Sequence, residues 1–242
     1  MAFGLSKRRY SLQAQQRVQM QADTDAGLRS YMLRVYNYMA SGVALTGLIA
    51  TFVSQSPELM QAIFAGPVKW VLFAGILGLG WMAPKIIMSK SMVAAQAAFW
   101  VYAGMFGALI APYFLVYTGA SIVRVFFITA AAFAGLSMYG YVTKRSLSGM
   151  GAFLVMGTWG LLIAIVVNIF LQSPVLQMAY SAIGVLIFAG LTAYETQGIK
   201  HMYYETDGHD MTTRKAIFGG MQLYGSFVMM FILLLNLFGS RD

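Results

Sequence analysis

Long apolar runs recur along this chain, and they decide what it can fold into. Each run has about the ~20 residues that a helix needs to cross the hydrocarbon core of a bilayer. The composition agrees, because 59% of the 242 residues are hydrophobic and 10% are charged, whereas a typical soluble domain has ~25% charged residues. The solvent around most of this chain is therefore expected to be lipid.

Seven of these runs are predicted to be transmembrane segments. They lie at 33–54, 69–88, 92–116, 121–142, 150–171, 176–199 and 216–238. Backbone amides find no water in hydrocarbon, so segments this long and apolar must be helices rather than open strands. The fold class expected is an all-α integral membrane protein, with a polar tail at 1–28 and one seven-helix domain at 29–242. Only the connections 55–68 and 200–215 are long enough to hold structure of their own.

Basic residues are unevenly divided between the two ends of the predicted helices. Thirteen of the 16 lie on the side of the N-terminus, namely Lys7, Arg8, Arg9, Arg17, Arg29, Arg34, Lys85, Lys90, Lys144, Arg145, Lys200, Arg214 and Lys215. The other side has Lys69, Arg124 and Arg241. Because basic residues favour the cytoplasmic side, the N-terminus is predicted to be cytoplasmic and the C-terminus periplasmic or extracellular. A re-entrant last segment is the alternative.

The net charge of +8 is explained by this basic collar, which would meet anionic lipid headgroups. The lipid bilayer is therefore the expected partner, and nucleic acid is not. The chain has no cysteine, and its two histidines, His201 and His209, have no zinc-ligand spacing in a connection expected to be solvated. We expect no cofactor. No nucleophile–base pair lies at membrane depth, so we do not expect an enzyme.

Glycines are frequent in three of the predicted helices. They are Gly75, Gly78 and Gly80 in the second, Gly151, Gly157 and Gly160 in the fifth, and Gly219, Gly220 and Gly225 in the seventh. Small residues allow helices to approach closely in lipid. We expect these glycines at helix contacts, with a gating hinge as the alternative.

Charged residues inside the predicted spans are candidates for function, because a charge in hydrocarbon is costly. Arg34, Arg124 and Lys85 lie close to span ends, where long side chains can extend to the headgroups. Interfacial anchoring is therefore the simpler interpretation of these three residues, and a functional role is the alternative.

Glu195 differs, since it is the only carboxylate inside a predicted span and its side chain is short. Desolvation favours the neutral acid, and a nearby cation would favour the carboxylate. Lys85 has a similar predicted depth, so an ion pair between the two is allowed. The residues leave two interpretations open: a structural ion pair, or a carboxylate that gates or contacts a cation.

Two stretches of the chain carry a family resemblance. FLVYTGASIVRVFFITAAAFAGLSMYGYVTKRSLSGMGAFLVMG and VLIFAGLTAYETQGIKHMYYE resemble the bacterial branch of the Bax inhibitor-1 family, and the resemblance covers residues 20–242. It implies a seven-helix fold in which the other six helices enclose the last. It also implies a calcium leak regulated by protons.

The family's motifs can be placed on individual residues. In its calcium-leak members, a Tyr-Asp-Thr motif pairs its aspartate with a second aspartate on the last helix. Tyr194, Glu195 and Thr196 match the first motif, with glutamate in place of aspartate, and Ser226 stands at the second position. A serine can hydrogen-bond Glu195 but cannot supply like-charge repulsion. Lys85 matches the family's basic residue on the second helix.

The function expected from this resemblance is a pH-sensitive calcium or other cation leak in a bacterial inner membrane, serving ion homeostasis or a stress response. Glu195, Lys85 and Ser226 are the candidates for pH sensing and gating, and Glu195 also for contact with calcium. Tyr194, Thr196, Arg124 and Arg34 are supporting candidates. The alternative is an interaction protein that modulates a membrane-bound protease through 1–28 and 200–215. A solute exporter is a third, weaker interpretation.

Overall fold

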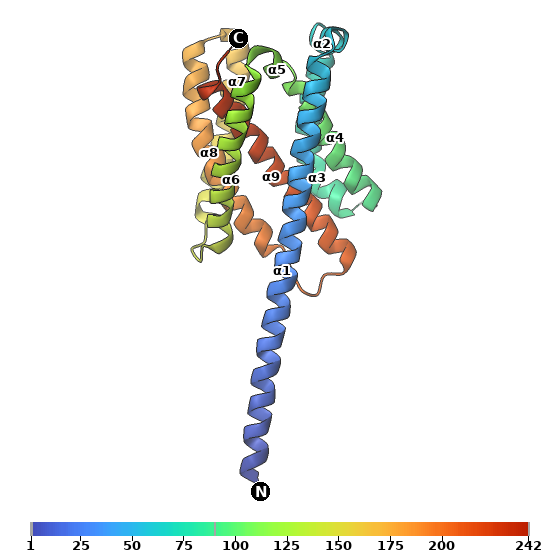
Figure 1. The fold of residues 1–242 in the computed structure, drawn as a ribbon, viewed down its shortest axis with the longest axis vertical. Coiled ribbons are helices and arrows are strands. Elements are labelled where there is room, and N and C mark those ends of the chain that lie inside the picture. The colour runs from blue at the N-terminus through green and yellow to red at the C-terminus, as the bar shows by residue number, and fades with distance from the viewer. Residues whose placement is uncertain (1, 90, 242) are drawn as a thin grey trace.

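Seven helical stretches of this chain are long and apolar enough to cross a membrane (Figure 1). The computed structural model describes residues 2–89 and 91–241, with the helical backbone alone for 2–24. The helices are α1 (Ala2–Ser54), α2 (Pro57–Phe64), α3 (Val68–Ser89), α4 (Met92–Ile110), α5 (Tyr113–Val116), α6 (Gly119–Val142), α7 (Ser148–Leu171), α8 (Pro174–His201) and α9 (His209–Phe238). The seven-helix fold class predicted from hydropathy is confirmed.

The predicted spans overlap these helices, with three differences. The first helix is longer than predicted, since α1 runs from Ala2 to Ser54 and includes residues 2–28, which were expected to form a separate polar tail. Proline ends α4 early, because Pro112 has no backbone N–H to donate and its ring clashes with the preceding turn. The predicted span 92–116 is therefore two helices, α4 and α5. The connection 55–68 contains α2, which begins after a Ser56 side chain that accepts from the Leu59 amide, with Pro57 in the first turn, a favoured arrangement at a helix start.

The last helix, α9, is the core of the bundle. Sixty-one per cent of its apolar stretch is buried, against 11–33% in the other six. It packs against α1, α3, α4, α6 and α8, and α7 packs on α8. Figure 1 shows α9 running obliquely among the other helices. The central placement implied by the family resemblance is confirmed.

Hydrogen bonds define one end of the bundle. At the end where α9 finishes, the Thr118 amide donates to the Ser240 carbonyl at 3.1 Å and the Ser240 amide donates to Ser121 Oγ at 2.9 Å. In Figure 1 the C-terminus lies near α5 and the N-terminus lies far away, at the opposite end of the molecule. The uninterrupted α9 therefore passes from one end of the bundle to the other, and the re-entrant alternative is not what the structure has.

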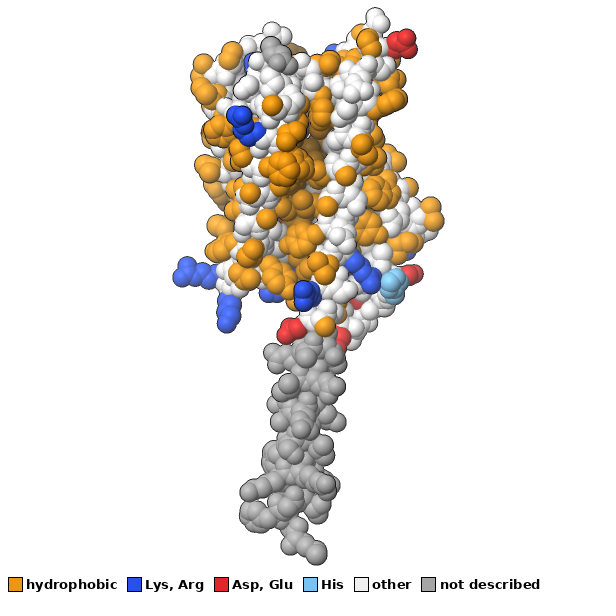
Figure 2. Space-filling model, in the orientation of Figure 1, with side chains coloured by type: hydrophobic (Ala, Val, Ile, Leu, Met, Phe, Trp, Pro, Cys, Tyr) orange, Lys and Arg blue, Asp and Glu red, His pale blue; other side chains and the backbone are white. Residues whose placement is uncertain are grey.

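Charges gather at one end of the bundle. Figure 2 shows most of the visible Lys and Arg side chains at the lower end of the apolar surface. We call this the basic end, and define it by Arg29, Lys144, Arg145, Lys200 and Lys215. Lys90 and the side chains of Lys7, Arg8, Arg9 and Arg17, which the charge count placed on this side, lie outside the described residues.

The glycines divide into two groups. A Cβ at Gly151, Gly219 or Gly220 would lie within 3.0 Å of a neighbouring helix, whereas Gly78 and Gly160 have open space around them. Close helix contact therefore explains the first group, and it does not explain the second. Gly140 of α6 also lies at a close helix contact, because a Cβ there would overlap the Ala193 carbonyl oxygen of α8.

Candidate functional site

Glu195 joins α8 to the central helix. It lies six residues before the end of α8 at His201, which is ~9 Å along the helix axis. Ser226 Oγ of α9 donates a hydrogen bond of 2.6 Å to Glu195 Oε2. The two family positions that the sequence aligned, one on each helix, are therefore in direct contact.

A cavity of about 330 Å³ lies beside this pair, and residues of α3, α4, α7, α8 and α9 line it. Most of its lining is apolar. The polar side chains on it are Tyr102, Thr158, Glu195, Gln222 and Ser226. Glu195 is the only charged group among them, so the electrostatic character of the cavity changes with the protonation of one carboxyl.

Lys85 does not reach this cavity. Its side chain is exposed, and within the described part of the chain it makes no ion pair with Glu195. Ala83 is the residue of α3 that is buried and lines the cavity. Residues two apart on a helix do not share a face, so Lys85 is directed away. The ion pair that similar depth allowed between Glu195 and Lys85 is therefore not formed among the described residues, because the two side chains point in different directions.

The neighbours of Glu195 in the motif contact two other helices. The Tyr194 ring packs against Gly151 of α7, so closely that a Cβ on Gly151 would lie 2.6 Å from the ring. Thr196 is fully buried and its hydroxyl lies 2.8 Å from Ser137 Oγ of α6. Three consecutive residues thus fasten α8 to α7, α9 and α6.

The buried hydroxyl of Thr196 belongs to a chain of polar groups. Ser137 Oγ lies 2.9 Å from Tyr36 Oη of α1, and Thr196 Oγ1 also donates to the Thr192 carbonyl at 2.7 Å. This chain runs through α8, α6 and α1, and it shares no residue with the cavity beside Glu195.

The two remaining supporting candidates lie away from Glu195. Arg34 of α1 is partly exposed and lines a separate polar recess of about 320 Å³ with Trp100, His209 and Thr213. Arg124 is exposed on α6. Neither arginine lines the cavity, so the structure does not bring them together with Glu195.

Oxygen ligands for a cation are few. Among the described residues, no group of three or more His, Asp or Glu side chains is placed to hold a metal ion. At the cavity, a cation could meet one carboxylate, the Gln222 amide and three hydroxyls. Such a set suits passing contact better than tight binding, since calcium prefers six to eight oxygens.

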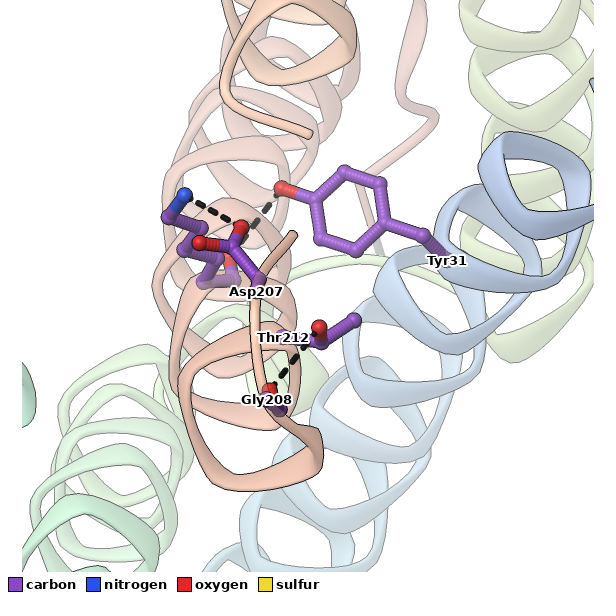
Figure 3. A network of polar contacts seen from close by, with 5 residues as sticks. Tyr31, Asp207, Gly208 and Thr212 are labelled. Atoms are coloured by element: carbon purple, nitrogen blue, oxygen red, sulfur yellow. Dashed lines mark hydrogen bonds and ion pairs between the residues drawn. The ribbon is translucent and has the colours of Figure 1, made fainter. Parts of the chain in front are cut away.

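The connection between α8 and α9 is fastened to the bundle, whereas the sequence indicated a solvated loop (Figure 3). Lys215 Nζ and Asp207 Oδ2 are 2.5 Å apart, and Tyr31 Oη of α1 donates to the Lys215 carbonyl at 3.5 Å. The rings of Tyr31 and Tyr203 stack with centroids 5.6 Å apart. In the sequence, the two adjacent tyrosines, Tyr203 and Tyr204, were the feature that could have indicated packing of this connection against the bundle. The predicted exposure of His201 and His209 themselves is confirmed.

Comparison with known proteins now decides the family. Residues 28–242 match the family described as "Inhibitor of apoptosis-promoting Bax1". The chain belongs to the Bax inhibitor-1 family. It is 37% identical to inner membrane protein YbhL of Escherichia coli K12 over 219 residues, which cover 89% of this chain and 94% of YbhL. It is also 41% identical to an uncharacterized protein of Caulobacter vibrioides over 229 residues, which cover 90% of this chain and 91% of that protein.

Membership in the Bax inhibitor-1 family makes this an integral membrane protein, in agreement with the seven long apolar helices. The family resemblance implied a carboxyl at the position of Ser226. Here the α8–α9 contact is a carboxyl–hydroxyl hydrogen bond instead. In this chain the contact therefore contains one titratable group, where a carboxylate pair would contain two.

Proposed function

We propose that this protein is a pH-sensitive calcium leak of the bacterial inner membrane, in which Glu195 lines and closes the pathway. One observation carries the proposal: Glu195 is bonded to the central helix and is the only charged group on the cavity between five helices. A lone carboxylate at this depth is costly, which makes it a candidate for function.

The chemistry follows from the charge state of this group. An ionised Glu195 accepts the hydrogen bond from Ser226 and attracts a cation into the cavity. A protonated Glu195 can donate to the serine and offers a cation only a neutral oxygen. Protonation therefore changes both the cavity charge and the contact that holds α8 to α9, without any contribution from Lys85.

Calcium flux into liposomes tests the proposal. Purified protein would be reconstituted as the wild type, Glu195→Gln and the control Glu58→Gln, which makes the same chemical change at an exposed residue outside the bundle. Flux would be measured between pH 5 and pH 8. We expect the wild type and Glu58→Gln to leak with the same pH dependence, and Glu195→Gln to leak at a rate that no longer varies with pH.

The outcomes separate the leak from the role of Glu195. A wild-type flux no greater than that of empty liposomes would overturn the leak. A Glu195→Gln flux that still follows the wild-type pH curve would retain the leak and remove Glu195 as its sensor. Ser226→Asp adds a second carboxyl beside the first, and two coupled groups titrate in two steps, so we expect its pH response to be broader.

The alternative function, modulation of a membrane-bound protease, has less support. It uses the connection 200–215 as a contact surface, and Tyr203 and Asp207 of that connection are already engaged by α1 and α9. Absence of flux together with a partner captured by the full chain and lost on deletion of 1–28 would favour this alternative.

A further inference from the structure

A groove separates α1 from α6 on the outside of the bundle. Its volume is about 610 Å³, within the ~300–1,000 Å³ of small-molecule sites. Its lining residues are Arg29, Met32, Leu33, Tyr36, Met39, Ala40, Ala130, Phe133, Ala134, Ser137, Met138, Tyr141 and Phe227. None of these residues lines the cavity beside Glu195. The groove is therefore separate from that cavity.

The walls of the groove are apolar and its rim is open. Leu33 and Met138 on the rim expose 54% and 64% of their surface, while Phe133 and Phe227 at its base expose only 4% each. Because Phe227 belongs to α9, the groove reaches the central helix. An apolar recess on a lipid-facing surface is filled most favourably by hydrocarbon, which here means an acyl chain.

One mouth of the groove is positively charged. Arg29 lines it at the basic end, and its side chain is exposed. Tyr141 lines the same mouth, and Lys200 Nζ donates to the Tyr141 carbonyl at 2.8 Å and lies 5.0 Å from the centre of its ring. Two cations therefore stand where an apolar groove meets the membrane surface.

This geometry points to a binding site for one anionic phospholipid, with an acyl chain between α1 and α6 and the phosphate at Arg29 and Lys200. Basic pockets between transmembrane helices are a recognised way to hold acidic headgroups. A zwitterionic lipid would fit the apolar walls equally well, but its headgroup cation would face Arg29. The charged mouth therefore gives the site a preference for net negative charge.

Photolabelling of the intact protein in phosphatidylcholine vesicles tests the site. The probes are phosphatidylglycerol and phosphatidylcholine, each carrying a photoreactive diazirine on an acyl chain, and peptide mass spectrometry locates the adducts. We expect phosphatidylglycerol to label residues 29–40 and 130–141 in preference to other lipid-facing segments. We expect its labelling there to exceed that by phosphatidylcholine about fivefold.

Two matched pairs of variants test the headgroup contact and the acyl-chain contact separately. Arg29→Gln should abolish the preference for phosphatidylglycerol, while Arg145→Gln, at an exposed arginine of the same end, should retain it. Ala134→Phe places a ring in the groove and should lower labelling by both probes. Ala132→Phe makes the same change on the outer face of α6, away from the groove, and should leave labelling unchanged.

Three results would overturn the proposal. Equal labelling of the groove by the two probes in the wild type would remove the anionic preference. Unchanged labelling of Ala134→Phe would show that the adducts form outside the groove. A crosslink between α1 of one copy and α6 of another would show that a second protein chain, and not lipid, fills the space.

Discussion

Two faces of α9 meet the rest of the bundle in opposite ways. On the face formed by Gly220 and Tyr224, which we call the filled face, the Tyr224 ring packs against Phe99, Tyr102 and Phe106 with centroid distances of 5.8–6.2 Å. On the face formed by Gly225 and Ser226, the hollow face, the helix borders the 330 Å³ cavity. Tyr224 of the filled face directly precedes Gly225 and Ser226 of the hollow face in the sequence.

The polar contacts of the two faces differ in the same way. Tyr224 Oη lies 2.6 Å from Thr46 Oγ1 of α1. The Thr46 hydroxyl also donates to the Ala103 carbonyl. Both partners are buried and neither ionises easily. On the hollow face, Ser226 is bonded to a carboxyl that can gain or lose a proton. The filled face therefore packs α9 tightly against its neighbours, and the hollow face is the one that has a titratable group at its contact.

The largest effect on the free energy of unfolding should come from removing the buried ring of the filled face. Tyr224→Ala removes a fully buried ring, and we expect it to lower the free energy of unfolding by ~3–5 kcal/mol. Tyr224→Phe keeps the ring and removes one hydrogen bond, so it should cost ~1 kcal/mol. Denaturation in detergent micelles followed by circular dichroism measures both. A loss below ~1 kcal/mol for Tyr224→Ala would mean that this face is not tightly packed.

A smaller effect should distinguish two glycines of the same helix. Gly220→Ala places a Cβ 2.6 Å from Tyr38 Cβ and 3.1 Å from the Val35 carbonyl oxygen, whereas the nearest atom to a Cβ on Gly225 is Tyr102 Oη at 3.7 Å. We expect Gly220→Ala to destabilise by ~1–3 kcal/mol and Gly225→Ala to remain within ~0.5 kcal/mol of the wild type. The same denaturation measurement compares them. Equal losses would contradict the distinction between the faces.

The hydrogen bond on the hollow face should contribute less. A double-mutant cycle with Ser226→Ala and Glu195→Ala isolates it, since each change removes one partner, and we expect a coupling energy of ~0.6 kcal/mol, typical of hydrogen bonds between membrane helices. The measurement is the difference in unfolding free energy among the four proteins at one pH. A coupling of zero would mean that Ser226 and Glu195 do not stabilise the α8–α9 contact.

The smallest effect is expected at Lys85. Its side chain is exposed, so Lys85→Gln should change the free energy of unfolding by less than ~0.5 kcal/mol. It should also leave the pH dependence of calcium flux unchanged. A pH curve displaced from that of the wild type would show that Lys85 acts on the hollow face in a state with a different arrangement of α3.

Much of this fold could be predicted because the bilayer imposes it. Seven helices follow from hydropathy, since hydrocarbon requires each span to satisfy its own backbone hydrogen bonds. Glu195 could be singled out for the same reason, because it is the one carboxylate inside a span. The early end of α4 could also have been predicted, since Pro112 interrupts the helix.

The contacts of the site could not be predicted in the same way. Depth follows from counting 1.5 Å per residue, but the direction in which a side chain points depends on how the helices pack. Lys85 and Glu195 have similar depth and do not meet. The contacts of Tyr203 and Asp207 follow no helical period, so only the folded connection shows that they bind α1 and α9.

The central position of α9 also has a consequence for biosynthesis. The helix that contributes the core follows α1 to α8 in the chain, so those helices are synthesised before the surface that they pack against. Fifteen residues of α9 are buried, and none is available until α9 itself has been translated. A chain truncated before His209 would keep the earlier spans and lack this core, so assembly of the bundle depends on α9.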